Sequence, residues 1–252
     1  MTSNFFICFA KNKVCLPSLF KAEKKNTVHL ISNVEKLSKE AVFAFDIHGV
    51  LFKRKLNQIL YETVKNIDSS LLFNIFKNPS FLYTTYQLFS KNRVIEQSLK
   101  TLGKKYPFFD KYVDRYIEIS NLQEPTKAIE IMHELKKLGH KVFILSNIGA
   151  EAFEQLKKGN PGVFDIIDGA IVSEASDGYI QKPQPDAYKK LLNNFNLKPE
   201  NVVFIDDSLR YINAAQKLGI NTVHYTSLRD LQDGLEQLGI QNMSIQNTSF
   251  QK

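Results

Sequence analysis

We predict a doubly wound α/β fold, a parallel sheet with helices on both faces, which is interrupted by an all-helical insertion. Three observations carry this prediction: short apolar runs that end in polar residues, amphipathic stretches that alternate with them, and a helical segment after the first run. The length of 252 residues allows one large domain or two modest ones.

The apolar runs are rich in β-branched and aromatic side chains. A strand that is buried on both faces of a parallel sheet has this composition. The three strong runs span residues 41–45, 141–145 and 201–205, and weaker strand patterns lie at 169–172 and 221–225.

Amphipathic patterns alternate with these strands, and a glycine follows two of them, as is common at the C-terminal end of a helix. Strands that alternate with helices indicate parallel crossovers. The predicted helices span residues 126–138, 185–195 and 208–218.

Residues 54–123 contain no strand-like run that ends in a polar residue, and they carry Leu, Phe and Tyr at helical spacing. We therefore expect a helical domain at 54–123, inserted between two parts of an α/β core. The core then comprises 27–53 and 124–240, with an N-terminal extension at 1–26 and a C-terminal tail at 241–252.

Polar residues follow each strong strand, and ligands of open α/β sheets bind beyond the carboxyl ends of the strands. Converging carboxylates repel one another unless a cation neutralises them, and Mg²⁺ prefers oxygen ligands. Each polar residue could instead only cap the next helix. The residues that we expect at this edge are Asp46, His48, Ser146, Asn147, Asp206 and Asp207.

Four motifs in this order give the chain a family resemblance. They are the run 45–51 around Asp46, the run 145–147, Lys182-Pro183 within 178–186, and the run 204–208. With these motifs, residues 41–226 resemble the haloacid dehalogenase superfamily, whose members are mostly phosphatases with a Rossmann-like core. The helical insertion is similar to the cap of that family, which closes over the substrate.

The resemblance implies a role for each motif. Asp46 would attack phosphorus and form an aspartyl-phosphate. Ser146, together with backbone N–H groups at Asn147, would hold the non-reacting phosphoryl oxygens, and Lys182 would balance their charge. The acidic partner of the protein is then a small phosphorylated substrate.

The resemblance also implies a Mg²⁺ site. Its ligands would be Asp46, the backbone carbonyl of His48 and the acids of the fourth motif, Asp207 most directly and Asp206 nearby. This ion would neutralise and orient the phosphoryl group.

Two residues depart from the family pattern. His48 stands where the phosphatases usually carry a second Asp, which protonates the leaving group and activates water. His48 could do the same work, the enzyme could be impaired and serve binding or regulation, or the leaving group could differ, as in dehalogenases and phosphonatases. Tyr211 stands where related sequences often have Asn, which puts the geometry of that loop in question.

Charge and cysteine content bear on the partners and the compartment of the protein rather than on its chemistry. The net charge of +7 comes mostly from scattered Lys residues, so we expect no nucleic-acid partner. No apolar run is long enough for a membrane span. Cys8 and Cys15 are the only cysteines, and no charged leader precedes the apolar residues 5–10, so we expect a cytoplasmic protein. The sequence does not indicate an oligomeric state.

Overall fold

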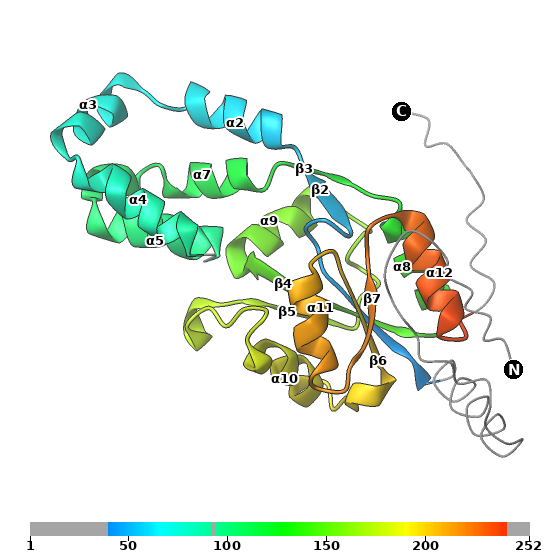
Figure 1. The fold of residues 1–252 in the computed structure, drawn as a ribbon. Helices are drawn as coiled ribbons and strands as arrows, with labels where there is room; N and C mark the ends of the chain where they lie inside the picture. The colour runs from blue at the N-terminus through cyan, green and yellow to red at the C-terminus, as the bar shows by residue number, and fades with distance from the viewer. Residues whose placement is uncertain (1–39, 92–93, 241–252) are drawn as a thin grey trace, which may run out of the picture.

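The computed structural model describes residues 40–91 and 94–240 (Figure 1), so the predicted extension, the predicted tail and both cysteines lie outside the described residues. A five-stranded sheet forms the centre, in the order β5-β4-β1-β6-β7, and all neighbouring strands in it are parallel. Its strands confirm the predicted ones: β1 (Val42–Phe45), β4 (Lys141–Gly149), β5 (Gly169–Ser173), β6 (Val202–Asp206) and β7 (Asn221–His224).

The register of the central strands brings the polar residues together. Phe45 of β1 pairs with Ile144 of β4 and with Ile205 of β6. Asp46 and Asp206 therefore lie level with each other where their strands end, and Ser146 lies just beyond on the neighbouring strand.

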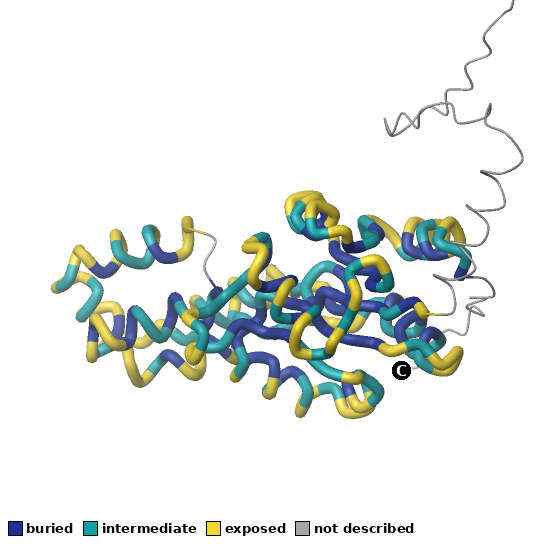
Figure 2. The backbone as a smooth tube through the Cα atoms, turned by 90° about the horizontal axis from the view of Figure 1, so that it is seen from below, coloured by how far each residue is buried: buried dark blue, intermediate teal, exposed yellow. Residues whose placement is uncertain are grey.

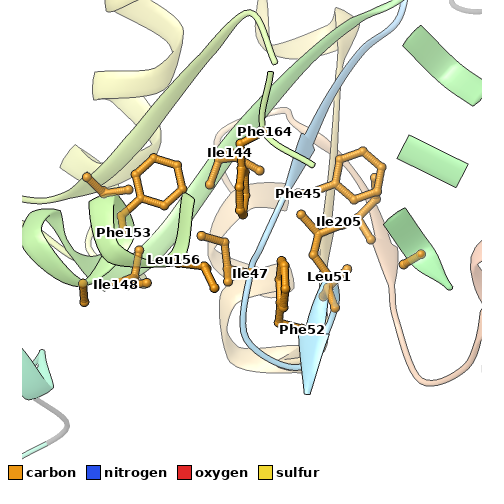
Figure 3. Close-up of a cluster of buried hydrophobic side chains, with 14 of the residues drawn as sticks. Phe45, Ile47, Leu51, Phe52, Ile144, Ile148, Phe153, Leu156, Phe164 and Ile205 are labelled. Atoms are coloured by element: carbon orange, nitrogen blue, oxygen red, sulfur yellow. The ribbon is translucent and has the colours of Figure 1, made fainter. Parts of the chain in front are cut away.

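Helices cover both faces of the sheet, because the side chains of each strand alternate between two apolar clusters. In β1, Phe43 and Phe45 belong to one cluster and Ala44 to the other. Figure 3 shows Phe45, Ile144 and Ile205 in the first cluster. The first cluster includes residues of α8 (Ala128–Lys137), α9 (Ala150–Gly159) and α12 (Leu228–Gln237), and the second includes residues of α10 (Pro185–Asn194) and α11 (Leu209–Gln216).

A helical insert follows the first strand, as predicted, and it extends to one side of the sheet (Figure 1). We use "helical insert" for its six helices. They are α2 (Leu56–Lys65), α3 (Ser69–Lys77), α4 (Ser80–Ser90), α5 (Ile95–Lys105), α6 (Pro107–Asp110) and α7 (Val113–Ser120). Aromatic rings hold it together, since Phe81 lies 5.1 to 5.4 Å from the rings of Tyr106, Phe108 and Phe109.

The sequence did not predict the ribbon that joins the helical insert to the core. It consists of β2 (Phe52–Arg54) and β3 (Gln123–Pro125), which pair antiparallel. Three-residue strands with charged residues are too short to show an alternating pattern. Two short 3₁₀ helices complete the described elements, η1 (Ala175–Asp177) and η2 (Pro199–Asn201).

The α/β core buries more of its residues than the helical insert does (Figure 2). The strands of the sheet are mostly buried, whereas α2 has no buried residue, and apolar side chains such as Leu60 and Phe76 are exposed. In the described part of the chain, every helix is too short or too polar to cross a membrane.

Candidate active site

A buried lysine joins two of the strand-end carboxylates. Lys182 Nζ lies 3.0 Å from Asp46 Oδ1 and 2.5 Å from Asp206 Oδ2, and the three side chains are at most 8% exposed. Burial lowers the pKa of Lys182, but the carboxylates of Asp46 and Asp206 raise it by more, so the net shift is upward. The lysine therefore stays charged between its two partners. These contacts bring together three of the sequence motifs, those that contain Asp46, Lys182 and Asp206.

Both carboxylate oxygens of Asp206 accept hydrogen bonds within the protein. Its Oδ2 accepts a hydrogen bond from Lys182, and its Oδ1 accepts one from the backbone N–H of Ser208 at 2.8 Å. Burial raises the pKa of this carboxyl above its usual range, and Lys182 opposes that shift. Asp206 thus acts first as the partner that positions Lys182.

Asp207 is the more open of the paired acids. Its carboxylate lies against Gly49, where a Cβ would collide with it, and Gly49 has φ +92°, a conformation that side chains rarely adopt. Burial and the neighbouring Asp46 both raise the pKa of Asp207. A glycine at position 49 lets the first loop approach this carboxylate closely.

Three carboxylates converge at this edge of the sheet. Asp46, Asp206 and Asp207 each offer an oxygen, and these oxygens lie within 4.8 Å of one another. Lys182 supplies one positive charge against three negative ones, so a divalent cation would balance the remainder. Oxygen donors of this kind fit Mg²⁺.

A pocket of about 520 Å³ opens beside this acidic cluster. Ser146 Oγ lies at its wall, buried and without a hydrogen-bond partner among the described residues, so it is a donor available to a ligand. The lining residues are Asp46, His48, Gly49, Lys53, Arg54, Leu56, Val94, Ile95, Ser146, Asn147, Gln181, Asp207 and Tyr211.

Asn147 has a further role that the sequence did not suggest. Its side-chain oxygen accepts a hydrogen bond from the backbone N–H of Lys182 at 2.7 Å, and its Nδ2 donates to the carbonyl of Lys182 at 2.9 Å. This pair of bonds fixes the backbone that carries the lysine. The residues are 35 positions apart, so no local pattern could reveal the contact.

Tyr211 supports the same loop. Its hydroxyl accepts a hydrogen bond from Asn147 Nδ2 at 3.3 Å, and its ring centre lies 5.1 Å from Lys182 Nζ, as does that of Phe204. The backbone carbonyl of Tyr211 accepts a bond from the Tyr188 hydroxyl at 2.9 Å. The residue that departs from the family pattern thus contacts two of the predicted site residues.

His48 lies in the turn between β1 and β2 and borders the pocket. Burial lowers the pKa of this imidazole to about 3, with the positive charges of Arg54 and Lys182 adding to the effect and Asp46 opposing it. The side chain is therefore neutral at pH 7, and it can accept a proton.

Arg54 is a pocket residue that the sequence analysis did not select. It ends β2, whose three residues are too few to show a strand pattern, so no sequence signal indicated that Arg54 would border the pocket.

Comparisons with known proteins identify the family of this chain. A family model described as haloacid dehalogenase-like hydrolase matches residues 41–219. A sesquiterpene phosphatase, astK of Aspergillus oryzae, is 30% identical over 105 residues, which is 42% of this chain and 52% of that protein. The chain therefore spans about half the length of this curated relative.

Solved structures show the same fold. A HAD family enzyme from Bacteroides thetaiotaomicron has a TM-score of 0.53 at 18% identity, over 72% of this chain and 91% of that one. The L-2-haloacid dehalogenase of Xanthobacter autotrophicus has a TM-score of 0.51 at 18% identity, over 80% and 84% of the two chains. At these identities the likeness concerns the fold alone.

Proposed function

The chain belongs to the haloacid dehalogenase-like hydrolases, and from that premise we propose that it is a Mg²⁺-dependent phosphatase of a small phosphorylated metabolite. The observation that carries this proposal is the acidic cluster of Asp46, Asp206 and Asp207 beside a pocket that holds the unpartnered hydroxyl of Ser146. An anion bound there would meet a nucleophile, a cation and a free donor at once.

Asp46 is the proposed nucleophile. Its carboxylate attacks phosphorus and an aspartyl-phosphate forms, while the bond from phosphorus to the leaving oxygen breaks and that oxygen keeps the electron pair and takes a proton from water. The contact of 3.0 Å with Lys182 holds the orientation of Asp46 before the attack. The same lysine and the Ser146 hydroxyl then offset the charge on the non-reacting oxygens.

The three acids would hold Mg²⁺, with Asp207 the most available ligand and the carbonyl of His48 a further one. When bound, this ion supplies charge neutralisation for the incoming phosphate. Asp206 contributes mainly through Lys182, because both of its oxygens already accept hydrogen bonds.

His48 is the proposed base of the second step. A neutral imidazole takes a proton from the water that attacks the aspartyl-phosphate, and the carboxylate of Asp46 leaves. The negative charge of a bound phosphoryl group raises the pKa of a neighbouring imidazole, which favours this transfer.

The helical insert is proposed as the cap over the substrate. Leu56 and Ile95 of this insert, together with Val94 directly before α5, form an apolar part of the pocket wall. This wall fits a phosphate ester with an apolar carbon skeleton, and the sesquiterpene phosphatase similar to this chain is named for such a substrate. We therefore propose apolar phosphate esters as the first substrates to assay.

One second candidate is favoured by a specific residue. His48 replaces the usual acid/base Asp, which supports an impaired relative that binds phosphorylated ligands without turning them over. The dehalogenase alternative has less support, because the acidic cluster suits a metal and a phosphoryl group better than a carbon–halogen bond.

The test is hydrolysis of an aryl phosphate by the full chain, with and without Mg²⁺. We expect activity that needs Mg²⁺ and that falls by about 10³-fold or more in Asp46→Asn. Lys104→Gln, an exposed residue of α5, is the control. Equal rates for wild type and Asp46→Asn would overturn the phosphatase proposal, and phosphate binding without turnover would support the binding protein.

A further inference from the structure

Arg54 presents a cation to the pocket without a partner of its own. It ends β2, borders the pocket beside His48 and Asp207, and its Nε is buried without a hydrogen bond. Within 40–91 and 94–240, no carboxylate lies within 4.0 Å of its guanidinium. Arg115 of α7 differs, since it pairs with Glu62 at 3.6 Å and with Glu118 at 3.1 Å.

An unpaired guanidinium is costly to bury. Burial lowers the pKa of Arg54, while the charges of Asp46 and Asp207 oppose that shift. These acids are near enough to attract the cation but do not bond to it. The planar donors of Arg54 are therefore free for an anion that enters the pocket.

The position of Arg54 indicates which anion this is. The groups assigned to the transferred phosphoryl, Ser146 and Lys182, come from the core strands and their loops. Arg54 comes from the ribbon that leads into the helical insert, and Lys53 next to it also borders the pocket. The apolar lining residues Leu56 and Ile95 also come from the helical insert, so we expect the rest of the substrate to extend toward these residues and past Arg54.

We propose that Arg54 binds a second anionic group of the substrate, next to the phosphoryl group that is transferred. This proposal rests on the proposed phosphatase function and narrows its substrates to phosphorylated metabolites with a second phosphate or a carboxylate close by, such as diphosphate esters. The guanidinium binds that group with two parallel N–H···O bonds.

The test is calorimetric binding of three probes to the full chain at one free Mg²⁺ concentration. Methylphosphonate carries one anionic group, methylenediphosphonate adds a second phosphonate, and phosphonoacetate adds a carboxylate. The wild type should bind at least one two-anion probe about 10- to 100-fold more tightly than methylphosphonate, the range of a charge-assisted hydrogen bond. The tighter of the two identifies the second group.

Arg54→Gln should remove this preference and leave the affinity for methylphosphonate within about threefold, whereas Arg54→Lys should keep part of it. Ser146→Ala should lower the affinity for all three probes by a similar factor, and Lys104→Gln should leave all three affinities unchanged. Thermal unfolding of each variant checks that it is folded. Should Arg54→Gln not fold, the wild-type preference and its partial retention in Arg54→Lys still decide the matter.

Two results would overturn this inference and leave the proposed phosphatase function intact. In the first, the wild type binds all three probes with equal affinity. In the second, Arg54→Gln lowers the affinity for all three probes by the same factor. The second would assign Arg54 to the transferred phosphoryl group. Failure of every probe to bind the wild type would instead overturn the proposed phosphatase function together with this inference.

Discussion

Glu96 of the helical insert accepts a hydrogen bond from the backbone N–H of Ala152 in the core, with 3.2 Å between the nitrogen and Oε2. Ala152 lies in the first turn of α9, which directly follows the strand that carries Ser146. Glu96 is 5% exposed, and its Oε1 also pairs with Lys100 at 3.3 Å. A carboxylate at a helix N-terminus satisfies a free N–H and the helix dipole, so this contact ties the insert to the core beside the site.

Glu96→Ala should lower the free energy of unfolding by about 1–3 kcal/mol, because it leaves a buried N–H without an acceptor. Glu96→Gln should cost less, since the amide oxygen can still accept. Urea unfolding measures both. Lys100→Gln removes only the partly exposed partner and should cost under about 1 kcal/mol. A Glu96→Ala variant no less stable than Lys100→Gln would contradict this role.

Lys182→Met should destabilise the metal-free protein by about 3–5 kcal/mol, the usual cost of removing one partner from a buried ion pair. The variant leaves Asp46 and Asp206 facing each other without a cation. Thermal unfolding with and without Mg²⁺ measures the effect, and Mg²⁺ should restore part of the lost stability because it neutralises these acids.

The matched control for this change is Lys189→Met. Lys189 pairs with Asp186 at 3.6 Å, and both side chains are more than half exposed, so its loss should cost under about 1 kcal/mol. Equal costs for the two variants would show that Lys182 does not stabilise the carboxylates.

The residues that the sequence located are those fixed by strand register. Asp46 and Asp206 each end an apolar run, and parallel pairing sets such residues side by side. Contacts between residues that are far apart in the chain could not be predicted from the sequence. Glu96 and Ala152 are 56 residues apart, and neither belongs to a motif. Arg54 was missed because the ribbon that positions it has only three residues in each strand, which is too few for a periodic signal.

Asp177 predicts a pH dependence of stability. Its Oδ2 accepts a hydrogen bond from Lys190 at 2.6 Å, and its Oδ1 accepts one from the backbone N–H of Ile180 at 3.2 Å. Burial raises the pKa of Asp177, but these two bonds, the positive charge of Lys190 and the backbone of Glu174 together lower it by more, so the net pKa lies below its usual value of 3.8. The stabilisation is thus present above that value and is lost as the pH falls through the folded-state pKa.

Urea unfolding of wild type and Asp177→Asn between pH 3 and pH 7 measures this contribution. The wild type should be more stable at pH 7, by about 1 kcal/mol or less for a partly exposed pair, and the difference should shrink below about pH 4. Asp186→Asn, at a more exposed carboxylate, should show a smaller change. A difference that grows on acidification would refute the sign.

His48→Ala should slow the second half of the proposed reaction. Burial lowers the pKa of His48 from its usual 6.5 to about 3, so the imidazole of the free protein is neutral at pH 7 but weakly basic. In the proposed second step, the negative charge of the phosphorylated Asp46 raises that pKa and lets the imidazole take a proton from the attacking water. Turnover of an aryl phosphate should fall by about 10²–10⁴-fold. Because Asp46 still attacks, rapid-quench kinetics should show a burst of the released phenol and an accumulating phosphorylated enzyme.

The His48→Asp variant distinguishes a working base at position 48 from a chain that has lost its phosphatase activity. If His48 is the working base, the Asp variant retains turnover that the Ala variant lacks, and its pH profile changes because a different group then accepts the proton. If His48→Ala turns over as fast as wild type and His48→Asp is faster than both, the imidazole performs no chemistry. The chain is then an impaired relative, in which a carboxylate at position 48 rebuilds the missing acid/base group.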